Sequence, residues 1–227
     1  MSGGPTAQPF SPASRGRLTG RDLDRFTGNT LFDRLARAVC RAGCLPRKEL
    51  YEAWEVARRV RRILHGRRVV DLGAGHGLLA QAMLLLDDSS PGALVADKVL
   101  PPSCARVHEA LVDAWPRLAG RVTFIERDMD RVEITAGDIV VSSHACGRLT
   151  DVVLARAAAA RACVAVLPCC HDLATEDARD LAGWIDRAAA IDVERAVRLR
   201  ARGYRIRSLL IPAAVTPKNR LLVGEPQ

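Results

Sequence analysis

Apolar residues recur at helical spacing in two stretches near the start of the chain. The first covers residues 31–42, between Thr30, which suits a helix start, and Gly43, which suits a helix end. The second covers residues 46–64. Because an apolar stripe with a period of about 3.6 residues is typical of a helix packed along one face, we expect two amphipathic helices here.

From residue 68 onwards, short apolar runs alternate with helical segments. The runs that suit strands lie at residues 68–72, 93–97, 122–126, 138–142 and 163–167, and a terminal pair of strands is expected at 204–211 and 220–223. Such alternation indicates a parallel sheet with helices on both of its faces. The sequence therefore predicts a doubly wound, mostly parallel α/β sheet.

The chain divides into three parts by composition and pattern. Residues 1–20 are rich in Gly, Pro, Ser and Thr, and we expect a disordered tail there. Residues 21–66 hold the two helices and are expected to form an N-terminal helical cap. Residues 67–227 are expected to form one cofactor-binding domain, because 227 residues with 48% hydrophobic content suit a single α/β domain with a modest addition.

A glycine-rich turn follows the first strand and leads into a helical apolar run. Its sequence is Asp71-Leu72-Gly73-Ala74-Gly75-His76-Gly77. Glycines let the backbone turn tightly and let a ligand approach the main chain closely. The N-terminus of a helix behind the turn adds free N–H donors. An ordinary glycine-rich turn is the simpler interpretation, but Asp71 argues against it, because an acid at a strand end would be poorly solvated without a partner.

Acidic residues also end the next two strands. Asp97 lies twenty residues after Gly77 (97 − 77), and an acid at the end of the second strand can accept hydrogen bonds from both ribose hydroxyls of a nucleoside. Asp128 and Met129 follow the third strand. Asp97 alone could be a solvated loop acid. Three acids at three successive strand ends indicate a shared nucleoside site instead.

The spacing Asp-x-Gly-x-Gly-x-Gly differs from the G-x-G-x-x-G of dinucleotide enzymes. It resembles motif I of the class I methyltransferases that depend on S-adenosylmethionine (SAM). The resemblance implies SAM as the cofactor and a seven-stranded sheet whose last strand is antiparallel. It also implies that Gly73, Gly75 and Gly77 lie at the cofactor, and that helices before the first strand cap the substrate entrance. The ammonium and sulfonium of SAM suit a nearby carboxylate such as Asp71.

The same resemblance assigns roles to residues after the second and third strands. Asp97 would hold the ribose hydroxyls. In the family, an acid after the third strand accepts a hydrogen bond from the adenine amino group, and the next backbone N–H meets the ring. Asp128 and Met129 match these two places.

Two further loops carry a second set of polar residues. His144-Ala145-Cys146-Gly147, with Thr150-Asp151, follows the fourth strand, and Pro168-Cys169-Cys170-His171 follows the fifth. These segments resemble a methyltransferase-domain family whose eukaryotic members include the tRNA 2′-O-methyltransferase that modifies the acceptor stem. The resemblance covers roughly residues 68–171. These motifs do not identify the substrate; together with the basic charge of the chain, the resemblance favours RNA (tRNA or rRNA), with a ribose hydroxyl as the expected acceptor.

The loop after the fourth strand carries the candidate catalytic residues. A hydroxyl acceptor benefits from a base near neutral pKa, which favours His144; a loop histidine that only binds backbone is the alternative. A carbon acceptor would instead need a thiolate, and Cys146 is a candidate for it. Both could also join Cys169, Cys170 and His171 at zinc. Because no C-x-x-C occurs, we expect no metal.

Charge and cysteine usage narrow the setting of the protein. The formal net charge is +8, so a polyanion such as RNA is an expected partner. Seven cysteines without disulfide-framework spacing fit a reducing compartment. No signal-peptide pattern or apolar run near about 18 residues is present, so we expect no membrane association and a cytoplasmic location.

Two other functions remain open at this point. One is methylation of a hydroxyl on a small-molecule acceptor. The other is a SAM-binding protein without catalysis that serves as a partner subunit. The oligomeric state does not follow from the sequence.

Overall fold

The computed structural model describes residues 10–168, 170–173, 180–181 and 183–227. Its centre is a seven-stranded sheet in the order β3-β2-β1-β4-β5-β7-β6. The strands are β1 Arg68–Leu72, β2 Ala93–Asp97, β3 Val122–Glu126, β4 Asp138–Ser142, β5 Cys163–Val166, β6 Tyr204–Leu210 and β7 Arg220–Pro226. β1 to β5 pair in parallel, whereas β7 runs antiparallel to both of its neighbours. The predicted fold class is therefore confirmed.

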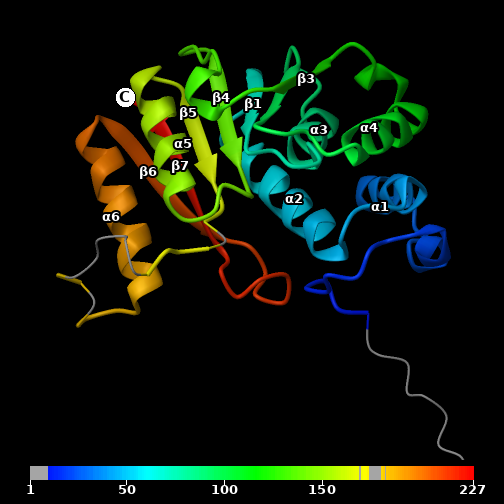
Figure 1. Cartoon of the computed structure of the whole chain (residues 1–227), viewed down its shortest axis with the longest axis horizontal. Helices are drawn as coiled ribbons and strands as arrows, with labels where there is room; N and C mark the ends of the chain where they lie inside the picture. The colour runs from blue at the N-terminus through cyan, green and yellow to red at the C-terminus, as the bar shows by residue number, and fades with distance from the viewer. Residues whose placement is uncertain (1–9, 169, 174–179, 182) are drawn as a thin grey trace, which may run out of the picture.

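Helices cover both faces of this sheet (Figure 1). The α-helices are α1 Leu31–Ala42, α2 Arg47–Val60, α3 Leu78–Leu86, α4 Ser103–Ala114, α5 Arg148–Ala159 and α6 Arg187–Ala201. Short 3₁₀ turns η1 Gly20–Arg25, η2 Pro116–Leu118 and η3 Met129–Arg131 lie between them. Alternate strand residues face opposite layers, as the pleat requires. Val69 and Ile139 pack with α1 to α4, and Val70 and Val140 pack with α5 and α6.

The two N-terminal helices share one hydrophobic core with the sheet. The Thr30 side chain accepts a hydrogen bond from the Asp33 N–H at the start of α1, and Gly43 ends α1 in the left-handed conformation, as predicted. α1 packs against α4, and α2 packs against α3 (Figure 1). The helices of the predicted cap are thus part of the layer on one face of the sheet.

The prediction of a disordered tail is wrong for residues 10–20, which pack against the helices. Leu18 is fully buried, and its N–H donates to the Leu45 carbonyl at 2.9 Å. The Arg47 N–H donates to the Gly16 carbonyl at 2.9 Å, and the rings of Phe10 and Phe26 meet edge to face at 5.8 Å. The apolar side chains in this polar stretch are enough to anchor it. Residues 1–9 lie outside the described part of the chain.

The glycine turn after β1 presses closely against β2. All three glycines have positive φ: 63° at Gly73, 53° at Gly75 and 69° at Gly77. A Cβ at position 77 would lie 2.8 Å from Cγ1 of Val95, whereas a Cβ at position 75 would meet nothing within 4 Å. The third glycine therefore serves packing, and the second leaves open space above the turn.

Asp71 lies behind the turn, in β1, and is only 1% exposed. Its Oδ2 accepts a hydrogen bond from the Ala80 N–H at 3.3 Å, and its Oδ1 has no hydrogen-bond partner among the described residues. Burial raises the pKa of this carboxyl to about 8, although the bond from Ala80 acts in the opposite direction. The group therefore holds a proton at neutral pH.

We expect Gly77→Ala to destabilise the protein by about 1–3 kcal/mol more than Gly75→Ala does. Both substitutions place a side chain at positive φ, so they share a backbone penalty. Only the Cβ at position 77 collides with Val95. Urea denaturation of the two variants measures the difference, and equal free energies of unfolding would contradict the packing argument.

Asp71 should make the protein less stable as the pH rises. The pKa of the carboxyl is 3.8 in the unfolded chain and about 8 in the folded protein. Between these two pH values the folded state therefore binds more protons than the unfolded state. The free energy of unfolding must then fall with rising pH through that window. Asp71→Asn keeps an oxygen for Ala80 and removes the titration. Its melting temperature should decline less than that of the wild type between about pH 5 and pH 8; parallel curves would count against the raised pKa.

Candidate functional site

A cavity of about 350 Å³ opens at the carboxyl ends of β1, β2, β3 and β4. The chain winds in opposite directions from β1 and from β4, and open α/β sheets bind ligands at such a switch point. The residues that line the cavity come from the loops after four strands and from the start of α5. They are Gly73, Gly75, Ala96, Asp97, Lys98, Arg127, Asp128, Met129, Asp130, His144, Ala145, Leu149 and Val152.

The structure brings most of the predicted site residues together in this cavity. Those that line it are Gly73, Gly75, Asp97, Asp128, Met129 and His144. Asp71 and Gly77 do not line it, because Asp71 is buried behind the turn and Gly77 packs against Val95. The predicted contact between Asp71 and the SAM cation is therefore not supported by the geometry. Both residues shape the turn from behind.

Asp97 is fixed at the end of β2 by two backbone donors. Its Oδ2 accepts a hydrogen bond from the Gly75 N–H at 2.8 Å, and its Oδ1 accepts one from the Lys98 N–H at 2.7 Å. A carboxylate has about four lone-pair sites, so both oxygens can still accept from two hydroxyls. The hydrogen bond from the Gly75 N–H also connects the glycine turn to the end of β2.

Charged residues of both signs stand at the rim of the cavity. Lys98 Nζ lies 3.8 Å from Asp128 Oδ1, and both side chains are more than half exposed. Arg127 and Asp130 also line the cavity and were not predicted. Arg127 directly precedes Asp128 and Asp130 directly follows Met129 in the sequence. Their position next to predicted residues was the one feature of the sequence that could have indicated them.

Two contacts from outside the strand ends support the glycine turn. The Cys104 thiol donates to the Gly75 carbonyl at 3.0 Å, and burial raises the pKa of this thiol to about 11, so it keeps the proton that it donates. On the other side, Glu49 of α2 lies 3.1 Å from Nδ1 of His76. Nothing in the sequence around Cys104 or Glu49 indicated these contacts, since both join segments that are distant along the chain.

His144 is half-buried, lines the cavity and lies close to α2. The Glu52 carboxyl of α2 is buried, which raises its pKa, while the charges of Lys48 and His144 act in the opposite direction. His144 thus lines the same cavity as Asp97 and Asp128 and acts electrostatically on Glu52. The role of His144 in proton transfer stays a prediction.

Cys146 lies on the other side of the same loop and is exposed. It lines a second cavity of about 370 Å³, with Gly147, Arg148, Leu149, Cys170, His171 and Asp172. Leu149 borders both cavities. The two predicted catalytic residues are therefore not in one cavity.

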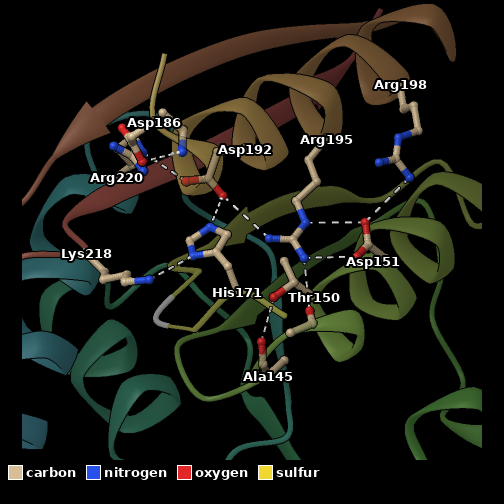
Figure 2. Close-up of polar contacts among 12 residues, drawn as sticks. Ala145, Thr150, Asp151, His171, Asp186, Asp192, Arg195, Arg198, Lys218 and Arg220 are labelled. Atoms are coloured by element: carbon tan, nitrogen blue, oxygen red, sulfur yellow. Dashed lines mark hydrogen bonds and ion pairs between the residues drawn. The ribbon is translucent and has the colours of Figure 1, made fainter. Parts of the chain in front are cut away.

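The described residues do not form a set of ligands for the zinc ion that the sequence left as an alternative. His171 is occupied by Asp192 and Lys218 (Figure 2). Among the residues that the structure describes, no group of three or more His, Cys, Asp or Glu could hold a metal ion. Cys169 lies outside the described residues. In the described ranges, no helix is long and apolar enough to cross a membrane.

Several solved methyltransferase structures share this fold at low sequence identity. An O-methyltransferase family protein from Burkholderia thailandensis has a TM-score of 0.53 and 19% identity, covering 93% of this chain and 64% of that one. A tRNA methyltransferase from B. subtilis has a TM-score of 0.51 and 14% identity, covering 76% and 65%. The chain thus spans just under two thirds of either protein. At these identities the likeness establishes the fold alone.

A third similar structure is a putative O-methyltransferase from Nostoc punctiforme, with a TM-score of 0.52 and 16% identity over 90% of this chain and 67% of that one. No curated protein matches the sequence. A family model described as a methyltransferase domain matches residues 48–177, which is more than half of the chain and includes both the glycine turn and the loop of His144. The chain belongs to this methyltransferase domain family.

Proposed function

We propose that this enzyme uses SAM to methylate RNA, with a ribose hydroxyl as the acceptor. One observation carries the proposal: a single cavity holds the residues suited to a nucleoside cofactor and, on the facing loop, a histidine suited to proton transfer. The family supports methyl transfer as the reaction class. The cofactor, the acceptor and the role of each residue are the parts proposed.

The residues that line the cavity offer a partner for each part of SAM. Positive φ and open space at Gly75 let a ligand approach the turn. Asp97 would accept from the ribose hydroxyls, Asp128 would accept from the adenine amino group, and the backbone of Met129 would face the ring. When bound, SAM supplies a methyl group on a sulfonium. The cavity volume of about 350 Å³ is within the usual range for cofactor pockets.

His144 would act on the acceptor. Its imidazole would accept the proton that the acceptor hydroxyl loses as the methyl carbon gains its bond to the acceptor oxygen and loses its bond to sulfur, which would leave as a neutral thioether. The surrounding loop would hold the hydroxyl in line with the methyl group, and such alignment supplies much of the rate enhancement in a displacement reaction. Cys146 has no role in this chemistry, which agrees with its position in the neighbouring cavity.

An extended acceptor suits the second cavity. Cys146, Arg148, Leu149 and Cys170 on its walls are all exposed, so a large substrate can reach it. The Arg148 guanidinium offers a partner for a phosphate, and the net charge of +8 favours a polyanion. Methylation of a hydroxyl on a small molecule is the second candidate, and hydroxyl acceptors of any size agree with the O-methyltransferases among the similar folds.

The direct test is incubation of the protein with methyl-labelled SAM and separate RNA, protein and metabolite fractions. We expect label in RNA, and in dinucleotides that survive alkaline hydrolysis, because a methylated 2′-hydroxyl cannot attack the adjacent phosphate. Label only in metabolites would favour the small-molecule enzyme. SAM binding without transfer to any fraction would favour a non-catalytic partner protein.

Asp97→Ala should weaken SAM binding by about 1.5–3 kcal/mol, because a charged group that accepts two hydrogen bonds is lost and the Gly75 N–H loses its partner. Calorimetry measures the affinity. Asp113→Ala, an exposed acid on α4 that does not line the cavity, is the matched control and should bind as the wild type does. Unchanged affinity in Asp97→Ala would remove Asp97 from the cofactor site.

His144→Ala should lower the rate of methyl transfer by about 10²–10⁴-fold and leave SAM affinity nearly intact, because a general base is lost while the cofactor residues remain. Cys146→Ser, on the same loop, should keep most of the activity. Single-turnover transfer of labelled methyl groups measures both rates. Loss of activity in Cys146→Ser would indicate a thiolate mechanism, and wild-type rates in both variants would make the loop structural.

A further inference from the structure

The buried guanidinium of Arg195 connects α6 to the loop of His144 (Figure 2). Its side chain is 0% exposed. Two nitrogens point to Asp151 of α5, with Nη2 at 2.9 Å from Oδ2 and Nε at 3.3 Å from Oδ1. Nη2 also donates to the Gly147 carbonyl at 3.0 Å. A planar guanidinium can make this set of bonds at once, and a lysine ammonium cannot.

Gly147 is held through both of its backbone groups. Its N–H donates to the Cys170 carbonyl at 3.1 Å, and its carbonyl accepts from Arg195 and from the Thr150 N–H. Its φ of 58° and ψ of −131° suit glycine only. The loop after β4 is therefore fixed, at this residue, to the loop after β5 and to α6.

The other end of the loop is fixed as well. The Ala145 N–H donates to Ser142 Oγ at 3.2 Å, and the Ala145 carbonyl accepts from Thr150 Oγ1 at 2.6 Å. Ser142 Oγ in turn donates to the Leu72 carbonyl at 2.7 Å, which joins the loop to β1. His144 lies within this clamped segment, so its backbone position depends on these bonds.

Arg195 is itself held in place by a second acid. Asp192, one turn earlier on α6, has its Oδ1 3.5 Å from Arg195 Nη1. Asp192 also meets His171 Nε2 at 2.7 Å and Arg220 Nε at 2.9 Å. Burial alone would raise the pKa of Asp192, but the bonds from His171 and Arg220 outweigh it and lower the pKa. The acid stays ionised, and the buried guanidinium lies between two carboxylates.

We propose that Arg195 is a positioning residue for methyl transfer, which holds the loop of His144 at the cofactor cavity through Gly147 and Asp151. The inference rests on the proposed function. None of Arg195, Asp151 and Asp192 lines the cofactor cavity, and the residues suited to SAM come from the ends of β1, β2 and β3. Arg195 therefore acts on the acceptor side of the site and leaves the cofactor side alone.

The test compares Arg195→Lys and Arg195→Met with Arg198→Met. Arg198 is the matched control, because it lies one turn further on α6 and meets the same Asp151 at 3.7 Å, but it is 57% exposed and makes no bond to Gly147 among the described residues. We expect Arg195→Lys to lower kcat by about 10–100-fold, as misplacement of a catalytic group does, and Arg195→Met to lower it at least as much. The SAM dissociation constant should stay within about two-fold, and Arg198→Met should match the wild type.

Amide hydrogen exchange over residues 143–150 provides a readout that needs no acceptor. Loss of the Gly147 anchor should speed exchange in this segment by about ten-fold or more in Arg195→Lys, and leave the glycine turn unchanged. If Arg195→Met does not fold, Arg195→Lys decides alone. Wild-type kcat and exchange in Arg195→Lys would overturn the proposal, and so would a parallel loss of SAM affinity and kcat, which indicates general damage.

The two proposals can fail separately. If the wild-type protein labels metabolites and not RNA, the kcat comparison is made with that fraction, and only the proposed RNA substrate is lost. If the wild type labels no fraction while exchange responds as expected, the proposed function fails and the holding role of Arg195 stands.

Discussion

The close approach of the glycine turn to β2 is the constraint on which the rest of the site depends. Gly77 leaves no room for a side chain beside Val95, and Asp97 at the end of β2 holds the Gly75 N–H. These contacts place the turn and the strand-end acids within one cavity. Cys104 and Glu49 brace the turn from two helices that belong to the same layer. The glycine-turn side of the cavity, which is the proposed cofactor side, is thus built into the packing of β1, β2 and the helices over them.

The loop of His144, which is the proposed acceptor side, is held by a different part of the molecule. The loop after β4 receives its anchors from β1, the loop after β5, α5 and α6. The last helix and the terminal hairpin thereby meet at Asp192 and Arg195, far from the glycine turn along the chain. Separate elements therefore position the glycine turn and the loop of His144. This arrangement suits a fold that serves many acceptors.

Several polar residues that the sequence offers as candidates for chemistry have a structural role instead. They lie in the segments His144–Gly147, Thr150–Asp151 and His171, and most of them stabilise the loop after β4. Thr150 and Asp151 bind a carbonyl and a guanidinium, and His171 binds an acid. Of these segments, His144 and Ala145 line the cavity at the strand ends, and His144 is the one predicted reactive side chain among them that does so. Backbone groups in loops next to buried strands need hydrogen-bond partners, and polar side chains of the loop supply them. This structural need explains why polar residues are concentrated in these loops.

The sequence by itself determined the parallel sheet, its flanking helices, the glycine turn and the acids at the strand ends. These features follow from periodicity and spacing over a few residues, which the chain carries locally. Only the tertiary structure decided that Asp71 is buried behind the turn, that residues 10–20 pack on the helices and that Cys146 lies outside the cofactor cavity. It also decided that Arg195 reaches Gly147, 48 positions away. Burial and pairing of this kind depend on how α6 and the last hairpin fold back over the sheet, and no local pattern encodes that path.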